Sequence, residues 1–139
     1  MNAEVVLDTH ILVYAVSTAA HEAPKAEVAG RLLAAGNAGV SGQILQEFFV
    51  TVTRKGRTPL SIPDAIEWLE VLDGLPCVPV DAPLVRLGAD LALRYQISYW
   101  DGAVLAAAHR LNATTLYTED LNHDQTYGSV RVVNPFRAN

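Results

Sequence analysis

The sequence predicts an α/β fold, with a short central parallel sheet of about 4–5 strands and helices on both faces. Short apolar runs alternate with longer segments whose apolar residues recur at helical spacing, which is typical of parallel sheets. The 139 residues are 50% hydrophobic, enough to bury one core. The sequence shows no internal repeat, linker or low-complexity segment, so we expect a single domain over residues 1–139.

Apolar runs and helical spacing predict strands at 5–7 and 40–41 and helices at 11–16, 21–35 and 43–55 in the first part of the chain. The first strand is expected to be buried because it is wholly apolar, and it ends abruptly at Asp8. Pro24 is compatible with the second helix because it falls in the first turn. Gly36 and Gly39 separate that helix from the second strand, and Gly56 ends the third helix.

The same patterns predict helices from 61 or 64 to 74, at 83–95 and at 101–111, and strands at 77–80, 115–117 and 130–133, in the second part. Pro79 places the strand at 77–80 near an edge of the sheet, because proline cannot donate a ladder hydrogen bond. The helix at 101–111 is rich in alanine and can pack closely against a neighbour.

Composition narrows the class of protein. The net charge of −5 argues against a generic nucleic-acid coat protein, which is usually basic, although a carboxylate cluster accounts for much of the excess. Cys77 is the only cysteine, which excludes disulfides within the chain and cysteine-based zinc sites. We expect a cytoplasmic protein without a membrane span, because the sequence has no long apolar run and no basic segment typical of a secretion signal.

Four carboxylates lie where predicted strands and helices meet, and each interrupts or ends an apolar segment: Asp8, Glu47, Asp101 and Asp120. Isolated carboxylates on apolar surfaces cost free energy unless a positive charge lies between them. Open parallel sheets bind ligands beyond the carboxyl ends of their strands, so three of the four belong at one edge, which Glu47 reaches from the side. Ligands that are all oxygen favour Mg²⁺ or Mn²⁺ over zinc. The pattern therefore predicts a metal-dependent nuclease.

Purely structural roles are also open to these residues. Asp8 is a favoured N-cap for the helix that follows, although Thr9 could serve as well. Ser98 and Asp101 match a capping box, which is compatible with a ligand role for the aspartate. Glutamate is common on helix surfaces, and Glu47 falls on the flank of the apolar stripe of its helix.

The segment after the strand at 115–117 carries further polar residues. Strand alternation puts Thr118 and Asp120 on one side and Glu119 on the other, so Thr118 could orient a carboxylate or a metal-bound water. Asp124 is a weaker fifth candidate, and His123 reads as loop surface.

A metal held by four carboxylates would lower the pKa of a bound water and neutralise a phosphate, so we expect phosphodiester hydrolysis that leaves 5′-phosphate and 3′-hydroxyl ends. Two other interpretations remain. An aspartyl-phosphate phosphatase would use Asp8 as nucleophile, but position 10 is histidine where a second aspartate is usual, and lysine is scarce. A catalytically inactive binding module would instead take a partner's arginine into the acidic pocket.

Four motifs follow one another along the chain: Val5 to Ala15, Ile44 to Phe48, Tyr99 to Ala103 and Thr118 to Leu121. In this order they resemble the opening motif and the next acidic motifs of PIN domains, specifically the VapC toxins of type II toxin–antitoxin systems. Val132 to Phe136 is similar to the family's ending. The resemblance covers essentially the whole chain.

The resemblance implies a three-layer PIN fold, usually homodimeric, that cleaves RNA with Mg²⁺ or, as a substitute, Mn²⁺. The catalytic and metal-binding set would be Asp8, Glu47, Asp101 and Asp120, supported by Thr9 and Thr118. It also implies a cognate VapB-type antitoxin that occupies the active site, with operator DNA bound only through the toxin–antitoxin complex. Two positions depart from the family pattern, because His10 stands where asparagine is frequent and Asp124 where glycine is common.

The RNA target, whether a tRNA or a ribosomal RNA, is not specified by these motifs. Its choice is expected to depend on basic residues around the cleft, for which the candidates are Arg54, Lys55, Arg57 and Arg94.

Overall fold

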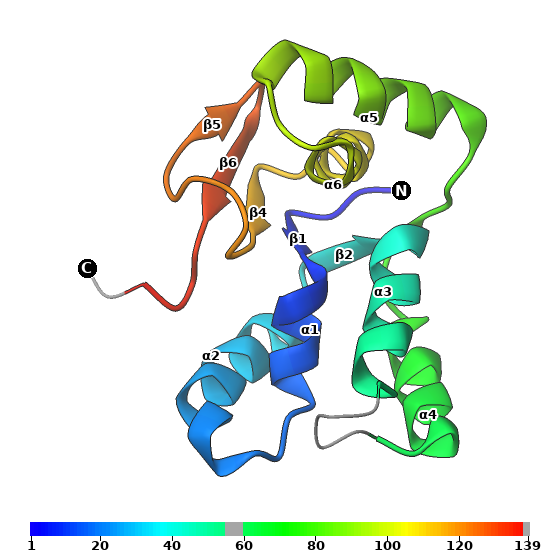
Figure 1. Ribbon diagram of the computed structural model, residues 1–139, viewed down its shortest axis with the longest axis vertical. Coiled ribbons are helices and arrows are strands. Elements are labelled where there is room, and N and C mark those ends of the chain that lie inside the picture. The colour runs from blue at the N-terminus through cyan, green and yellow to red at the C-terminus, as the bar shows by residue number, and fades with distance from the viewer. Residues whose placement is uncertain (55–59, 138–139) are drawn as a thin grey trace.

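The computed structural model describes residues 1–54 and 60–137, in which strands and helices alternate (Figure 1). The first part contains β1 (Val5–Leu7), α1 (Thr9–Ala15), the 3-10 helix η1 (Ala20–Glu22), α2 (Ala23–Ala34), β2 (Ala38–Ser41), α3 (Gly42–Val52) and α4 (Ile62–Leu72). The second part contains β3 (Cys77–Val78), α5 (Ala82–Tyr95), α6 (Tyr99–Arg110), β4 (Thr115–Tyr117), β5 (Thr126–Tyr127) and β6 (Val130–Val133).

The strands form one six-stranded sheet in the order β3-β2-β1-β4-β6-β5. The pairs β1–β2, β2–β3, β1–β4 and β4–β6 are parallel, whereas β5 pairs antiparallel with β6 through a turn at Gly128. The sheet therefore has one strand more than predicted, because β5 is too short to show an alternating pattern. The predicted edge position of β3 is confirmed, and the strand ends before Pro79.

Connection order explains the three layers. The chain steps from β1 to β2 to β3 in one direction along the sheet and then crosses back to β4, on the other side of β1. Since parallel connections are right-handed, this reversal puts α1 to α4 on one face and α5 and α6 on the other, as Figure 1 shows. The reversal also creates a switch point between β1 and β4, which is where ligands bind in open α/β sheets.

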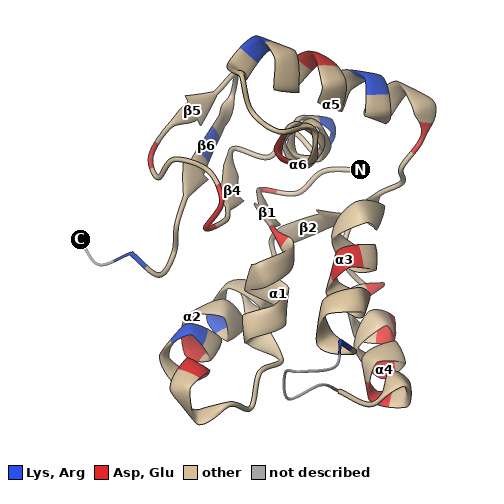
Figure 2. Cartoon of the chain, viewed as in Figure 1, with Lys and Arg blue, Asp and Glu red and all other residues tan. Residues whose placement is uncertain are grey.

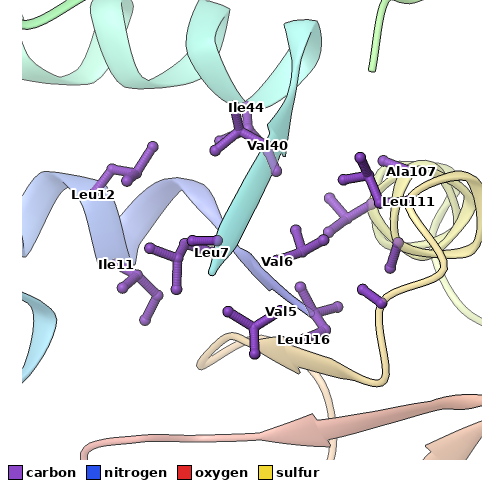
Figure 3. Close-up of a cluster of buried hydrophobic side chains, with 14 of the residues drawn as sticks. Val5, Val6, Leu7, Ile11, Leu12, Val40, Ile44, Ala107, Leu111 and Leu116 are labelled. Carbon is purple, nitrogen blue, oxygen red and sulfur yellow. The ribbon is translucent and has the colours of Figure 1, made fainter. Parts of the chain in front are cut away.

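The core surrounds β1, whose Val6 and Leu7 are fully buried. Figure 3 shows Leu7 among side chains of α1 and α3, including Ile11 and Ile44, whereas Val6 points toward Leu111 at the end of α6. Fully burying an aliphatic side chain of this size stabilises the fold by about 1.5–3 kcal/mol. The β1 backbone, and therefore the position of Asp8 at its end, is fixed from both faces.

Helix boundaries follow their caps. Ser98 accepts a hydrogen bond from the Asp101 backbone N–H, so α6 begins at Tyr99, two residues before the predicted start. The predicted helix at 21–35 is divided into η1 and α2, with Pro24 in the first turn of α2. No described helix is both long and apolar enough to cross a membrane.

Close packing between α5 and α6 fixes the position of Asp101. A Cβ atom on Gly102 would lie 3.0 Å from the backbone nitrogen and 3.1 Å from the Cβ of Ala92, and would meet the carbonyl oxygen of Gly88 even more closely. The two helices therefore approach through glycine, and Gly102 to Ala108 are all buried, as the alanine-rich sequence predicts. This contact holds the first turn of α6, which carries Asp101, against the fold.

Candidate active site

The switch point between β1 and β4 is occupied by polar side chains. Asp8 follows β1 directly and caps α1, while Thr118 and Asp120 follow β4. The Asp8 backbone N–H donates to the Tyr117 carbonyl oxygen at 3.1 Å, which ties the ends of the two strands together. Residues that are 110 positions apart in the sequence therefore meet at one edge of the sheet.

Asp8 is partly buried and both of its carboxylate oxygens accept a hydrogen bond. Oδ1 accepts from the Thr9 backbone N–H at 2.7 Å, and Oδ2 accepts from the Thr118 hydroxyl at 2.7 Å. Burial raises the pKa of Asp8 from 3.8 to about 6; the two hydrogen bonds oppose this rise, and the charges of Asp120 and Glu47 add to it. The N-cap role that the sequence suggested for Asp8 is therefore real, and it leaves a carboxylate that is costly to ionise.

Glu47 lies on α3, with an exposed side chain that is within electrostatic reach of Asp8. Buried Gln43, one helical turn earlier, donates from Nε2 to Glu47 Oε1 at 2.7 Å. This contact orients the glutamate. Sequence analysis missed Gln43, although its spacing of four residues from Glu47 is the spacing at which helical side chains meet.

Asp101 and Asp120 complete the acidic set. Asp101 is partly buried, and burial raises its pKa; the hydrogen bond with Ser98 lowers it, and the charge of Asp120 raises it further. Asp120 is exposed, and its backbone N–H donates to the Thr118 hydroxyl at 3.1 Å. Thr118, which is 1% exposed, therefore accepts from Asp120 while it donates to Asp8.

The donor set fits a hard divalent cation. The four predicted carboxylates come from four segments, and charge interactions connect Asp8 with Glu47 and Asp120, and Asp120 with Asp101. Among the described residues, the buried Thr9 hydroxyl, next to Asp8, has no hydrogen-bond partner. Within residues 1–54 and 60–137, however, no three Asp, Glu, His or Cys side chains converge closely enough to form a complete metal cage. The carboxylates thus form an open, mutually repulsive set.

The acidic set does not line either of two cavities in the described part of the chain. A cavity of 570 Å³ opens between the end of α1 and the end of α3, and a groove of 680 Å³ runs between α3 and α4. Neither is lined by Asp8, Glu47, Asp101 or Asp120.

The predicted basic residues do not gather at the carboxylates in the described part of the chain. Arg54 is exposed just after α3, and Arg94 is exposed in the last turn of α5, with its guanidinium carbon 5.8 Å from the Tyr95 ring centroid. Lys55 and Arg57 lie outside the described residues. Figure 2 shows acidic residues at the start of α1, on α3 and on α4, whereas α2 and α5 carry both basic and acidic residues. A role for these cations in RNA binding stays a prediction.

The two positions that depart from the family pattern have distinct environments. Asp124 has φ 67°, a left-handed conformation that favours glycine, and its carboxylate pairs with Arg131, which lowers its pKa. The adjacent His123 accepts a hydrogen bond from the Asn134 backbone N–H at 3.0 Å, so it supports the loop. His10 is exposed beside Asp8.

Sequence analysis also missed an ion pair between α2 and the turn after β4. Lys25 of α2 lies 2.8 Å from a Glu119 carboxylate oxygen and contacts the aromatic rings of Tyr14 and Phe136. These residues are remote from one another in the sequence, and no local pattern indicates that they meet.

The fold and the acidic set define a class: α/β proteins with an oxygen-rich site at the switch point of a parallel sheet. The family model of the PIN domain matches residues 5–129, and the chain therefore belongs to the PIN domain family. This confirms the predicted family and its three-layer fold. No curated protein matches the sequence.

Three solved structures share the fold. A chain of a toxin–antitoxin complex from Klebsiella pneumoniae has a TM-score of 0.72 at 17% identity, over 96% of this chain and 99% of that chain. VapC20 from Mycobacterium tuberculosis, described as a sarcin–ricin loop cleaving toxin, has a TM-score of 0.65 at 16% identity, over 84% and 89% of the two chains. A chain of VapBC2 from Rickettsia felis, bound to promoter DNA, has a TM-score of 0.61 at 20% identity, over 92% and 96%.

Proposed function

We propose that this protein is a metal-dependent endoribonuclease that hydrolyses RNA phosphodiester bonds. The observation that carries the proposal is the environment of Asp8, a partly buried carboxylate at the switch point, held by Thr118 and facing the charges of Glu47 and Asp120. Carboxylates that repel one another in this way are stabilised when a cation binds between them. The PIN domain match over residues 5–129 supports the same activity.

Mg²⁺, or Mn²⁺ as a substitute, would be held by Asp8, Glu47, Asp101 and Asp120. When bound, the ion supplies an activated water and neutralises charge on the scissile phosphate. The protein's own contribution is orientation. Thr118 holds Asp8, and Gln43 holds Glu47. Supporting hydrogen bonds of this kind typically change metal affinity or activity by about 10–100-fold.

We further propose that the enzyme is the toxin of a VapBC-type toxin–antitoxin system. Two of the three structures described above are toxin–antitoxin complexes, and one of these is bound to promoter DNA. A VapB-type antitoxin, a homodimeric toxin and binding of operator DNA through the complex follow from this assignment. A tRNA or ribosomal RNA substrate would place the activity in the cytoplasm. VapC20, a sarcin–ricin loop cleaving toxin with the same fold, offers one precedent for cleavage at a defined loop.

Cleavage of total cellular RNA tests the proposal. Purified protein, free of antitoxin, is incubated with Mg²⁺ or Mn²⁺, and the new RNA ends are sequenced. Two conditions should abolish cleavage: the Asp8→Asn variant, and the wild type in EDTA. Asp90→Asn removes an exposed carboxylate on α5 and is the matched control. We expect discrete cuts with 5′-phosphate ends in the wild type and the control, and none with Asp8→Asn or in EDTA.

Cleavage that survives EDTA or Asp8→Asn would overturn the assignment of a metal site. If the wild type does not cleave RNA with either ion, the enzyme assignment fails and the acidic set is better explained as a binding site for a cationic partner.

A further inference from the structure

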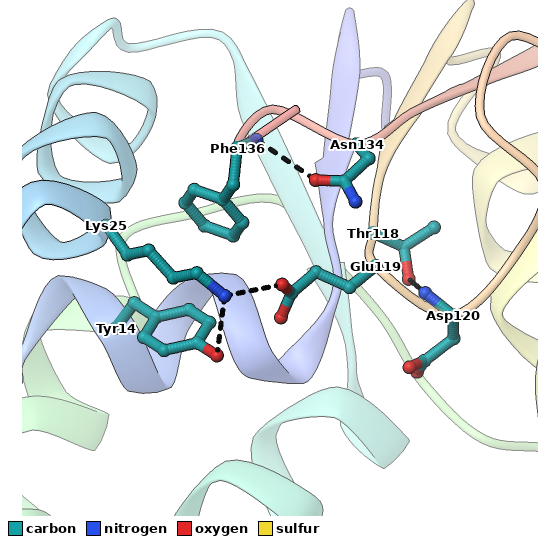
Figure 4. Close-up of polar contacts among 7 residues, drawn as sticks. All are labelled: Tyr14, Lys25, Thr118, Glu119, Asp120, Asn134 and Phe136. Carbon is teal, nitrogen blue, oxygen red and sulfur yellow. Dashed lines mark hydrogen bonds and ion pairs between the residues drawn. The ribbon is translucent and has the colours of Figure 1, made fainter. Parts of the chain in front are cut away.

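Lys25 contacts three segments that are remote from it in the sequence (Figure 4). Its Nζ atom lies 2.8 Å from Glu119 Oε2 and donates to the Tyr14 hydroxyl at 3.3 Å. The same atom lies 4.8 Å from the centroid of the Tyr14 ring and 5.1 Å from that of Phe136, and these two rings meet edge to face. These cation–π contacts add to the ion pair and the hydrogen bond, so the Lys25 ammonium group has partners on three segments.

Glu119 connects Lys25 to the acidic set, because it lies between Thr118 and Asp120 in the sequence. Figure 4 shows the Glu119 side chain extending to Lys25 while the Asp120 side chain points away from it. On the opposite side of the turn, Thr118 bonds to Asp8 and to the Asp120 backbone. The turn after β4, residues 118–120, is therefore held by contacts on both sides: Thr118 bonds to Asp8 of the acidic set, and Glu119 pairs with Lys25 of α2.

Asp120 depends on this turn for its position. No described residue donates a hydrogen bond to its carboxylate, and the side chain is exposed. The position of the Asp120 carboxylate therefore depends on the backbone of the turn after β4. A shift of the turn away from α2 would move Asp120 relative to Asp8 and Asp101.

We propose that Lys25 is a positioning residue, whose ion pair with Glu119 fixes the turn that presents Asp120 to the cation. The inference rests on the proposed function, because it concerns the same acidic set. Lys25 itself does not contact the reacting atoms. Its side chain is 40% exposed and that of Glu119 is 26% exposed, and exposed ion pairs contribute little to global stability. The effect of the pair is thus local.

The test compares Lys25→Met, Glu119→Gln and the double variant with wild type. Methionine keeps the apolar stem of lysine against the two rings and removes its charge. The matched control is Arg110→Met, which breaks a second exposed ion pair, Arg110 with Asp81 at 3.3 Å, on α6 and before α5. Mn²⁺ affinity is measured from the electron paramagnetic resonance signal of free Mn²⁺, without RNA. Thermal unfolding and the kcat and KM for an RNA oligonucleotide are measured in parallel.

We expect Lys25→Met and Glu119→Gln each to weaken Mn²⁺ binding and lower kcat by about tenfold, the size typical of residues that orient metal ligands, with KM for RNA unchanged. The double variant should lose no more than either single variant, because the two residues act as one pair. Lys25→Arg retains the charge and should recover most of the affinity. Arg110→Met should match the wild type in affinity and kcat.

Wild-type Mn²⁺ affinity and kcat in Lys25→Met would overturn the proposal, as would additive losses in the double variant or an equal loss in Arg110→Met. If the wild type binds no Mn²⁺ and cleaves no RNA, the proposed function fails instead. A wild type that binds and cleaves, beside unaffected Lys25 variants, isolates the failure to the positioning role.

Discussion

Removing the charge of Asp8 should stabilise the metal-free protein while abolishing its response to metal. The rise in the pKa of Asp8 from 3.8 to about 6 corresponds to about 3 kcal/mol that disfavours the ionised folded state. Asp8→Asn removes this penalty and keeps an oxygen that can accept from Thr9 and an amide that can donate to Thr118. It also loses the favourable interaction of a charge with the start of α1, about 0.5 kcal/mol. The net gain at neutral pH is therefore about 2.5 kcal/mol.

The pH dependence has a definite sign. Because the folded pKa of Asp8 lies above its unfolded value, the penalty is fully present above pH 6 and fades as the pH falls from about 6 toward 3.8. The advantage of Asp8→Asn should therefore be largest near pH 8 and should nearly vanish near pH 4.

Urea unfolding in EDTA at the two pH values measures this difference, with Asp90→Asn as the exposed control. Added Mn²⁺ should raise the unfolding free energy of the wild type and of the control, but not that of Asp8→Asn. A variant that is less stable than wild type at pH 8, or whose difference from wild type does not change with pH, would refute the reasoning about Asp8.

Three other substitutions test the surroundings of the site. Thr118→Val removes a hydrogen bond to Asp8 and one from Asp120, and should lower kcat for RNA by about 10–100-fold in a steady-state cleavage assay. Gln43→Leu frees Glu47 and should weaken Mn²⁺ binding by about tenfold in a calorimetric titration, with a melting temperature close to that of the wild type. Gly102→Ala places a methyl group against the α5 backbone and should cost about 1–3 kcal/mol in urea unfolding, whereas a more stable variant would contradict the observed contact.

The sequence predicts well whatever depends on local pattern. β4 and β6 occur at the predicted residues, because apolar strands between polar loops are distinct over a few residues. Asp8 was predicted as a candidate ligand because it ends such a strand, and that role stays a prediction. The parallel order of the sheet follows from the alternation of strands and helices. β5 was not predicted, because a strand of two residues is too short to show an alternation of apolar and polar side chains.

Contacts across the fold are the part that the sequence does not reveal. The Lys25–Glu119 pair joins residues 94 positions apart, and only the three-dimensional arrangement of α2 and the turn after β4 brings them together. Thr118 was predicted to orient a carboxylate from strand alternation, but that it bonds to Asp8 depends on the pairing of β1 with β4. Local sequence therefore predicts the candidate carboxylates, and tertiary structure shows which residues hydrogen-bond to them.

Anomalous diffraction from crystals of the wild-type protein soaked in Mn²⁺ tests the central claim most directly. We expect an anomalous peak at the switch point, about 2.1 Å from an Asp8 carboxylate oxygen and within coordination distance of at least one of Glu47, Asp101 and Asp120. No peak at Asp8 under saturating Mn²⁺, or a peak only at sites remote from it, would contradict the assignment of these carboxylates as the metal centre.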